Sequence, residues 1–383
     1  MCSYFETLTK TDCNGCGTCA LRCPAKAITM EKDSEGFLYP KINLKKCINC
    51  GLCRKICSNN PKKNSYKIKA YAAKNKDLNE RLCSTSGGIF KIIANDIISR
   101  GGVVFGVKFD KNLYAVHGYA TTLKDCQYFS YSKYIRSDLK DTYKKVEEFL
   151  KQDKWVLFTG TPCQNYGLKM YLRKDYKKLI LCEIICHSNP SPKVFHLYIK
   201  NIEKINKKKV NNYYFRNKNE KMKNQPYVIF SDGSTKIYNE FNKAFGEMLI
   251  SRPSCYNCQF CDLNRKADIT IGDFWGIEKV FPKLDDKKGI SLLCINSEKG
   301  AEEFERIKSK IDFLETEVTT AFKYNHHCNV KPHKKRDIFF KGISDGIINE
   351  NNIIKYMNKY VKVPLYKKVI NKSKRVVKKI IKK

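Results

Sequence analysis

A four-cysteine run occurs twice near the start of the chain and restricts the fold of this segment more than any other feature. The first copy reads CNGCGTCALRCP, from Cys13 to Pro24, and the second reads CINCGLCRKICS, from Cys47 to Ser58. Both have the spacing C-x2-C-x2-C-x3-C, and every cysteine of the first copy recurs at a constant offset in the second. Such self-similarity indicates a duplicated supersecondary unit. The N-terminal segment is therefore expected to consist of two equivalent loops.

The same spacing is typical of bacterial ferredoxins with two 4Fe-4S clusters, in which three thiolates of one run bind one cluster and the fourth binds the other. One cluster is expected on Cys13, Cys16, Cys19 and Cys57, and the other on Cys47, Cys50, Cys53 and Cys23. The second run departs from the pattern at Ser58, where ferredoxins usually have proline. Zinc is the alternative, but zinc sites use paired CxxC motifs and rarely three cysteines in succession.

The cysteine content indicates metal binding in a reducing compartment. The 383 residues include 19 cysteines, and the opening MCSYFETLTK lacks the charged and apolar regions of a secretory signal. The chain is therefore expected in the cytoplasm, where thiols stay reduced and closely spaced cysteines point to metal or catalytic sites rather than disulfides. With 42% apolar residues, a chain of this length is expected to fold into two or three globular domains.

The strong positive charge does not identify a partner. A net charge of +36 would ordinarily favour nucleic acid or an anionic membrane. Cluster thiolates would reduce that charge, and no recognition motif for nucleic acid occurs, so no nucleic acid is expected as a partner. The segment YKKVINKSKRVVKKIIKK (366–383) places Val and Ile on one helical face opposite its lysines. Peripheral contact with the anionic inner membrane surface, a solvated tail and a partner-docking helix all fit this pattern.

The rest of the chain has the pattern of a larger α/β domain. Short apolar runs alternate with helical stretches after a polar, basic linker at 58–69. We expect a dicluster domain over 1–60, the two parts of the larger domain over 70–150 and 151–335, and a helical basic tail over 336–383. The predicted fold class is an α+β ferredoxin-like dicluster domain followed by a larger α/β domain.

The loop STSGG opens a predicted helix over 84–101, whose buried face carries Ile89, Ile92, Ile93 and Ile97. Backbone N–H groups at such a helix start bind phosphates readily. A helix cap without a ligand explains Gly87 and Gly88 equally well.

Two later cysteines lie in predicted strand-to-helix turns, Cys163 in GTPCQ and Cys186 in ICHS. In a parallel sheet such turns lie at the carboxyl ends of the strands, where α/β folds bind ligands. With Cys255 and Cys258 of CYNCQFC they make the four thiolates that a third 4Fe-4S cluster needs. Alternatives remain open. Cys163 can act as a reactive thiol at a helix start, and Cys255, Cys258 and Cys261 can bind zinc with His187.

Several motifs occur in an order that resembles the coenzyme F420 hydrogenase/dehydrogenase beta-subunit family, over about residues 8–320 and fused to an N-terminal dicluster ferredoxin. These motifs are STSGG, SKYIRSDL (132–139), GTPCQ (160–164), ICHS, and RPSCYNCQF followed by ADITIGDFWG. The resemblance implies an α/β flavin-binding domain in which FAD lies beside an iron-sulfur cluster. It assigns the cluster to Cys163, Cys186, Cys255 and Cys258. It assigns flavin contacts to Ser86, Gly87, Gly88, Lys133, Tyr134, Ser137, Thr161, Pro162 and Gln164.

The resemblance implies an iron-sulfur flavoprotein oxidoreductase that passes electrons from ferredoxin or another redox protein to a substrate. Related bacterial proteins occur with polysaccharide-biosynthesis enzymes, but the motifs identify neither the substrate nor the use of coenzyme F420. The alternative is a non-catalytic electron-transfer subunit that docks to a partner enzyme.

Overall fold

The computed structural model describes residues 7–59, 61–218 and 224–361. The N-terminal unit contains the two short helices α2 (Thr18–Leu21) and α3 (Leu52–Lys55) and the antiparallel hairpin of β1 (Ile28–Lys32) and β2 (Leu38–Ile42). Each cysteine loop enters its helix through a glycine in the left-handed conformation, Gly17 with φ 76° and Gly51 with φ 67°. The duplication in the sequence is therefore also a duplication of backbone conformation, as predicted.

The larger domain is built on an eight-stranded sheet with the strand order β13-β3-β12-β11-β7-β6-β4-β5. Its centre is parallel and consists of β4 (Val103–Phe109), β6 (Val156–Gly160), β7 (Leu179–Ile184) and β11 (Ile269–Asp273). The strands β3 (Lys69–Asn75), β5 (Ala115–Ala120), β12 (Ser291–Ile295) and β13 (Ile311–Thr316) join through antiparallel pairs. Parallel strands end at the same sheet edge, so the turns after β6 and β7 lie side by side, as the sequence analysis expected.

Helices cover both faces of this sheet. All five residues of β6 are buried; Leu157 faces the core that contains α5 (Ile89–Ser99) and α12 (Glu298–Ile307). Val156 and Phe158 face the opposite core, formed with α7 (Thr142–Lys151) and α8 (Pro162–Leu172). The predicted buried face of α5 is confirmed. The layered α/β arrangement agrees with the predicted fold class.

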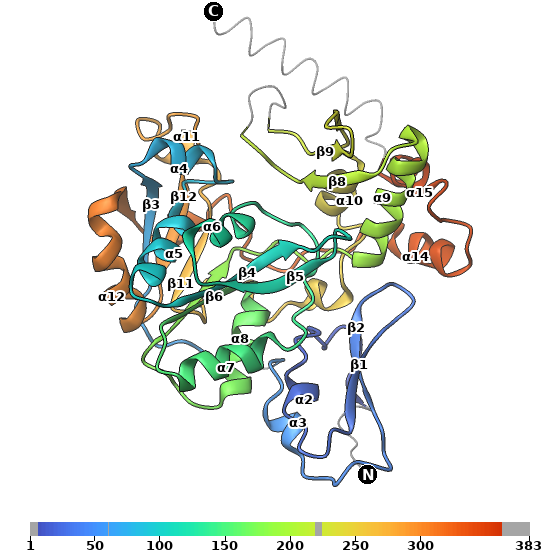
Figure 1. Ribbon diagram of the computed structural model, residues 1–383, viewed down its shortest axis with the longest axis horizontal. Helices are drawn as coiled ribbons and strands as arrows, with labels where there is room; N and C mark the ends of the chain where they lie inside the picture. Colours follow the sequence, from blue (N-terminus) through green and yellow to red (C-terminus); the bar gives the residue numbers. More distant parts are fainter. Residues whose placement is uncertain (1–6, 60, 219–223, 362–383) are drawn as a thin grey trace, which may run out of the picture.

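Short helices complete this domain at its edges. They are α4 (Leu78–Leu82), α6 (Leu123–Cys126), η1 (Gln127–Phe129), α11 (Ile277–Val280), η4 (Lys308–Lys310) and α13 (Val318–Phe322). The helices α11 and α13 place Ile277 and Phe322 in a further core beneath β3 and β12. These two helices therefore cover the sheet at β3 and β12, which lie far from the N-terminal unit (Figure 1).

A separate subdomain is formed by the antiparallel sheet β10-β9-β8 and four helices. Its strands are β8 (Val210–Tyr214), β9 (Tyr227–Phe230) and β10 (Thr235–Ile237), and its helices are α9 (Pro192–Asn206), α10 (Glu240–Gly246), α14 (Arg336–Ser344) and α15 (Ile353–Tyr360). Residues 336–361, which the sequence analysis placed in a basic tail, bury Phe339, Ile353 and Met357 in the core with α9. The basic segment 366–383 lies outside the described residues. Within the described ranges, no helix is long and apolar enough to cross a membrane.

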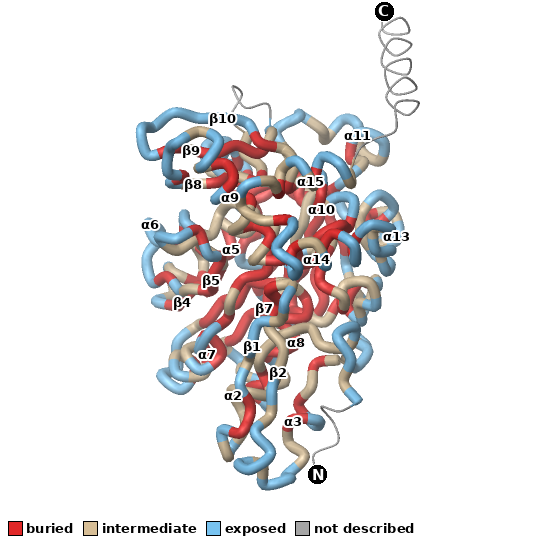
Figure 2. Tube along the Cα trace, turned by 90° about the vertical axis from the view of Figure 1, so that its right-hand side faces the viewer, coloured by how far each residue is buried: buried red, intermediate tan, exposed pale blue. Residues whose placement is uncertain are grey.

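The predicted linker at 58–69 is tied to the sheet domain. The Asn64 amide nitrogen donates to the carbonyls of Arg265 at 2.9 Å and Asn296 at 2.8 Å, and the Asn64 backbone N–H donates to the Asn264 side chain at 2.8 Å. Asn264 in turn donates to the Asn64 carbonyl at 2.7 Å. The N-terminal unit lies at one end of the molecule (Figure 2). The segment around Asn64 that follows it is held on the sheet domain by these hydrogen bonds.

Candidate iron-sulfur site

Four cysteines from three separate segments meet at the carboxyl ends of the parallel strands. Cys163 lies in the first turn of α8, directly after β6, and Cys186 follows β7. Cys255 lies in the short helix η3 (Pro253–Asn257), and Cys258 ends that helix. We call Cys163, Cys186, Cys255 and Cys258 the third set.

The loops of Cys186 and Cys255 are joined by backbone pairing. Pro190 and Ser251 form an antiparallel bridge, and the Ser188 and Ser251 hydroxyls are 2.7 Å apart. The Asn189 backbone N–H donates to the Cys255 sulfur at 3.3 Å. This pairing explains how residues far apart in sequence present their thiols to one another.

The thiols of the third set lie close enough together to raise one another's pKa. Burial raises the pKa of the Cys186 thiol well above its usual value, and the negative charges of Cys255 and Cys163 raise it further. Cys255 is affected in the same way, by burial first and also by Cys163, while the Asn189 N–H opposes the shift. Buried thiols that repel one another as thiolates require a positive centre to ionise together. The donor set therefore fits a 4Fe-4S core, whose ligation by these residues stays a prediction.

Cys261 lies beside this set. The Cys261 thiol donates to the Cys258 carbonyl and to the Asn329 side-chain oxygen, both at 3.2 Å. A hydrogen bond between the two sulfur atoms lowers the pKa of Cys261 and raises that of Cys258. His187, the fourth ligand in the zinc alternative, packs its ring against His326 at 4.7 Å between centroids.

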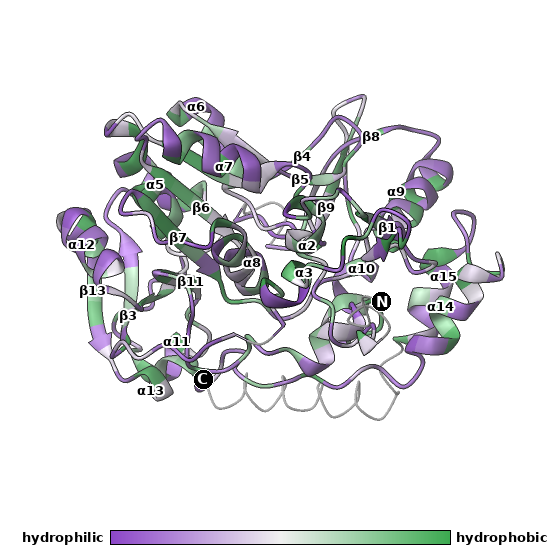
Figure 3. Ribbon diagram, turned by 90° about the horizontal axis from the view of Figure 1, so that it is seen from below, coloured by the Kyte–Doolittle hydropathy of each residue, from purple (hydrophilic) through white to green (hydrophobic). Residues whose placement is uncertain are grey.

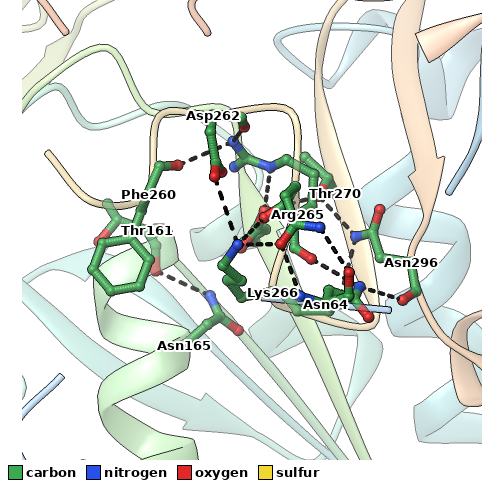
Figure 4. Close-up of polar contacts among 12 residues, drawn as sticks. Asn64, Thr161, Asn165, Phe260, Asp262, Arg265, Lys266, Thr270 and Asn296 are labelled. Carbon is green, nitrogen blue, oxygen red and sulfur yellow. Dashed lines mark hydrogen bonds and ion pairs between the residues drawn. The ribbon is translucent and has the colours of Figure 1, made fainter. Parts of the chain in front are cut away.

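The loop that carries Cys258 and Cys261 is fixed by a buried polar network (Figure 4). Arg265 Nε donates to the Glu183 carboxylate at 2.5 Å, and Arg265 Nη1 donates to the Phe260 carbonyl at 3.2 Å. Thr270 donates to the same carboxylate at 2.9 Å. The central strands β7 and β11 supply Glu183 and Thr270, so the sheet holds the loop rigidly.

In the N-terminal repeat, the inner set of Cys13, Cys16, Cys19 and Cys57 is brought together. Burial raises the pKa of the Cys19 thiol, followed by repulsion from the other three members. All four line one hollow of the N-terminal unit. Ser58, the departure from the ferredoxin pattern, is buried with its hydroxyl 3.4 Å from the Cys16 sulfur. The hydroxyl therefore takes a place beside the predicted cluster.

The outer set of Cys47, Cys50, Cys53 and Cys23 lies nearer the surface. Cys50 is exposed, whereas Cys53 is buried at the start of α3. The Cys23 sulfur accepts the Ala27 backbone N–H at 3.3 Å. The helix α3, which carries Cys53, packs against α2, which ends shortly before Cys23. As with the inner set, ligation stays a prediction.

No group of three or more His, Cys, Asp or Glu within residues 7–59, 61–218 and 224–361 has the arrangement that holds a metal ion. A 4Fe-4S cluster is a cube of iron and sulfide rather than one ion, so its ligands stand further apart.

The predicted flavin loop makes contacts within the protein. The Gly87 N–H donates to the Ser291 hydroxyl at 2.9 Å, and a side chain at Gly87 would lie 2.6 Å from the Ala73 carbonyl. The Ser86 hydroxyl donates to the Ile290 carbonyl at 3.1 Å. Gly88 caps α5 in the left-handed conformation. The missing side chain of Gly87 thus lets this loop pack closely on β3 and β12. The residue types of the loop alone did not reveal this packing role.

A second predicted flavin group forms a buried chain of hydrogen bonds. The Thr161 N–H donates to Gln164 Oε1 at 3.0 Å, Gln164 Nε2 donates to the Ser137 hydroxyl at 2.9 Å, and that hydroxyl lies 3.0 Å from His117 Nδ1. His117 Nε2 is 3.1 Å from the Thr159 carbonyl. Burial lowers the pKa of His117 to about 4, so its ring is neutral at pH 7. Pro162 is buried as the first residue of α8. This chain fixes the turn that presents Cys163.

The remaining predicted flavin residues are Lys133 and Tyr134. Lys133 Nζ donates to the Tyr128 carbonyl at 2.7 Å, and burial lowers the pKa of Lys133 to about 7. The Tyr134 ring packs against Phe215 and Phe245.

Sequence reasoning missed Arg136 and Arg252, two buried arginines that contact these cysteine loops. Arg136 Nη1 donates to the Cys163 sulfur at 3.3 Å, and Arg252 Nε donates to the Cys13 carbonyl at 2.9 Å. The available signal was their position inside the quoted motifs SKYIRSDL and RPSC.

This combination of a cysteine repeat and an α/β domain with its own cysteine set defines an iron-sulfur redox protein. Residues 12–60 match the family described as a 4Fe-4S dicluster domain. Residues 153–321 match the family described as the C terminus of the coenzyme F420 hydrogenase/dehydrogenase beta subunit. The chain is therefore similar to the coenzyme F420 hydrogenase/dehydrogenase beta subunit over residues 153–321 and to a 4Fe-4S dicluster domain over residues 12–60.

Two relatives illustrate the similarity. The F subunit of the F(420)H(2) dehydrogenase of Methanosarcina mazei is 23% identical over 328 residues, which cover 81% of this chain and 86% of that protein. A chain of the F420-reducing NiFe hydrogenase complex from Methanosarcina barkeri, solved as a xenon derivative, is 17% identical with a TM-score of 0.45. That comparison covers 78% of this chain and 94% of the other.

Proposed function

We propose that this protein is an iron-sulfur flavoprotein oxidoreductase. It passes electrons from a redox protein through two N-terminal 4Fe-4S clusters and a third cluster to FAD and then to a substrate. The observation that carries this proposal is the third set, because its four cysteines converge from two strand ends and a distant helix beside the inner set. Polysaccharide biosynthesis stays a prediction for the substrate, since no described contact identifies one.

The outer set supplies a suitable entry point for electrons. Leu44 is 56% exposed and Ile48 is 65% exposed, next to the exposed Cys50. Exposed basic residues flank these apolar residues in the sequence: Lys41, Lys45, Lys46, Arg54 and Lys55. A basic rim around a small apolar patch fits an acidic electron donor such as a ferredoxin, because opposite charges speed encounter.

The cysteine sets fit one-electron chemistry, which 4Fe-4S clusters supply when bound. Backbone N–H groups donate to Cys13 from Gly15 at 3.4 Å, to Cys255 from Asn189 at 3.3 Å, and to Cys258 from Phe260 at 3.4 Å. Such bonds stabilise negative charge on sulfur and so adjust the reduction potential. The chain's role at these sites is to hold the thiolates, exclude water and set that potential.

The residues around the third set partly fit FAD. Ser130 Oγ, near the predicted loop, is buried without a hydrogen-bond partner, and the Ser130 carbonyl lies 3.4 Å from the Thr85 hydroxyl. Two cations lie nearby: Lys218 contacts the Ser86 carbonyl, and Arg216 pairs with Asp273. Phosphates of a dinucleotide would be attracted to this region, and Lys133 would add to it. The polar atoms of Ser137 and Gln164 are used in the hydrogen-bond chain to His117. These two residues would therefore support the site without contacting the flavin.

The alternative function is an electron-transfer subunit that docks to a partner enzyme. The similar protein of Methanosarcina mazei is named as one subunit of a dehydrogenase, which supports this alternative. Trp275, two residues beyond Asp273, is 56% exposed and supplies an apolar contact near the same sheet edge. Large exposed aromatic residues are common anchors of protein interfaces.

The proposal is tested by iron and flavin analysis of anaerobically purified protein. We expect about twelve irons and one FAD per chain, because three 4Fe-4S clusters are proposed. Cys163→Ala should lose about four irons and keep the N-terminal eight. The matched control is Cys182→Ala, which removes a fully buried thiol from β7 outside the third set.

Loss of no iron in Cys163→Ala would refute the third cluster, and absence of flavin would refute the flavoprotein assignment. Turnover by the isolated protein with ferredoxin and an artificial acceptor supports the enzyme. Flavin-containing protein that transfers electrons only with a partner enzyme supports the alternative of a docking subunit.

A further inference from the structure

Arg136 connects the inner and third sets directly. It is 8% exposed, and its Nη1 donates to the Cys163 sulfur at 3.3 Å. Its Nη2 donates to the Gly15 carbonyl at 3.2 Å, on the loop between Cys13 and Cys16. One guanidinium group therefore contacts a sulfur of the third set and the backbone that wraps the inner set.

Arg252 makes a second connection between the same two sites. It is 1% exposed, and its guanidinium donates to the carbonyls of Cys13 and Leu38, both at 2.9 Å. Its own carbonyl accepts the Cys255 N–H at 3.0 Å, and its N–H donates to the Asn189 carbonyl at 2.9 Å. The side chain thus reaches the inner set while the backbone holds a loop of the third set.

The surroundings of these two arginines differ from those of other buried arginines. Arg265 pairs with Glu183, and Arg336 pairs with Glu35. Within the described part of the chain, neither Arg136 nor Arg252 forms an ion pair with Asp or Glu. A buried guanidinium without a counter-charge is costly. A 4Fe-4S core with four thiolates carries net negative charge, so clusters on both sides would neutralise these cations.

The two sets are also close through α8. A side chain at Gly167 would lie 2.8 Å from Cys16 Cβ and 3.3 Å from its sulfur. Gly167 lies four residues beyond Cys163 in α8, about 6 Å along the helix axis. The Thr18 hydroxyl donates to the Gly167 carbonyl at 2.8 Å, and α2 lies beside α8 (Figure 3). Cys16 therefore packs against α8, the helix that carries Cys163 in its first turn.

We propose that Arg136 and Arg252 form an arginine bridge that positions the inner and third clusters and raises the reduction potential of both. This inference rests on the proposed function. One electron leaves the reduced inner cluster and enters the oxidised third cluster; no bond is broken and no proton moves. Each reduction adds negative charge beside the bridge, so the two cations stabilise the reduced forms. In the described part of the chain, neither arginine side chain donates to a residue of the outer set, so the outer cluster should be affected least.

The test is a potentiometric titration of the full chain with dithionite, followed by electron paramagnetic resonance. Arg136→Gln should lower the midpoint potentials of the inner and third clusters while the outer cluster keeps its value. Arg136→Lys, which keeps the charge, should shift them less. Arg252→Gln, which removes the charge, should mainly lower the potential of the inner cluster, because the Arg252 guanidinium contacts the Cys13 carbonyl.

Arg100→Gln is the matched control. Arg100 is a half-buried arginine that pairs with Glu303, between α5 and α12, and should change no potential. If Arg136→Gln loses iron, the midpoint potentials of Arg136→Lys are compared with those of the wild type instead. Unchanged potentials in Arg136 variants that keep about twelve irons would overturn the bridge. Wild-type protein with only eight irons would instead overturn the proposed third cluster.

Discussion

The inner and outer cysteine sets share one spacing but have opposite surroundings. The inner set packs against α8 and two buried arginines, and Gly15 lies within contact distance of Arg252. The outer set has an exposed cysteine and exposed apolar neighbours in a basic rim. A duplicated motif therefore supplies equivalent ligands, while its placement on the larger domain assigns each copy a different role. The outer copy is the proposed entry point for electrons, and the inner copy lies beside the third set.

The largest expected effect comes from separating the inner set from α8. Gly167→Leu would place atoms against Cys16 and the Tyr143 hydroxyl, each 2.8 Å from the first added carbon. We expect a loss of about 1–3 kcal/mol in the free energy of unfolding, as for overpacked cores. Slower electron transfer from the N-terminal clusters should accompany it. Denaturant unfolding and rapid-mixing absorbance measure the two effects.

The matched control is Gly246→Ala. Gly246 ends α10 and has no atom near an added side chain. Equal effects of Gly167→Leu and Gly246→Ala would contradict the packing of the inner set on α8.

Charge reversal should affect the outer set alone. Lys45→Glu with Lys46→Glu should slow reduction by an acidic donor about tenfold at low salt, because electrostatic steering is lost. Cluster content and potentials of the inner set should stay the same. Stopped-flow reduction at several salt concentrations measures the effect, which should vanish as salt rises. Lys154→Glu with Lys310→Glu, at exposed sites on the larger domain, should leave the rate near wild type.

A smaller effect concerns the His117 chain that supports the Cys163 turn. Burial lowers the pKa of His117 to about 4 from 6.5, so its contribution to stability is complete above pH 6.5. It is lost as the pH falls toward 4, since the unfolded chain then binds a proton that the folded chain resists. The slope is about 1.4 kcal/mol per pH unit.

His117→Gln should reduce the pH slope of stability by about this amount, measured by thermal unfolding of the anaerobic protein between pH 7 and pH 5. The remaining slope belongs to groups such as His196 and His326, whose pKa burial also lowers to about 4. The exposed His327 gives the control variant His327→Gln, which should keep the slope. An unchanged slope in His117→Gln would show that another group causes it.

Local features of this molecule were predictable from the sequence. The repeat predicted two equivalent loops, and Gly17 and Gly51 adopt the same conformation in both. The strands around GTPCQ and ICHS were predicted because apolar runs before a turn are local signals, and β6 and β7 are confirmed as parallel neighbours. The grouping of Cys163 and Cys186 follows from that topology, although their cluster stays a prediction.

Long-range contacts were not predictable. The segment at 58–69 has the composition of a linker, yet Asn64 docks on the sheet through partners about two hundred positions away. The Gly87 N–H was a candidate to bind a phosphate, with a helix cap without a ligand as the alternative, and in the structure it donates to Ser291. Arg136 lay inside a quoted motif without an assigned role, because only the fold shows that its two ends contact Gly15 and Cys163. Residue types show what a group can bind, not which partner the fold gives it.

The most direct test of this account is the electron paramagnetic resonance spectrum of the fully reduced protein compared with Cys163→Ala. The account predicts magnetic coupling between the inner and third clusters, because Cys16 packs against α8, the helix that carries Cys163. Removing the third cluster should therefore change the line shape of the remaining N-terminal signals as well as the total spin. A spectrum that only loses intensity, with the N-terminal line shape unchanged, would contradict the placement of the inner set beside the third set.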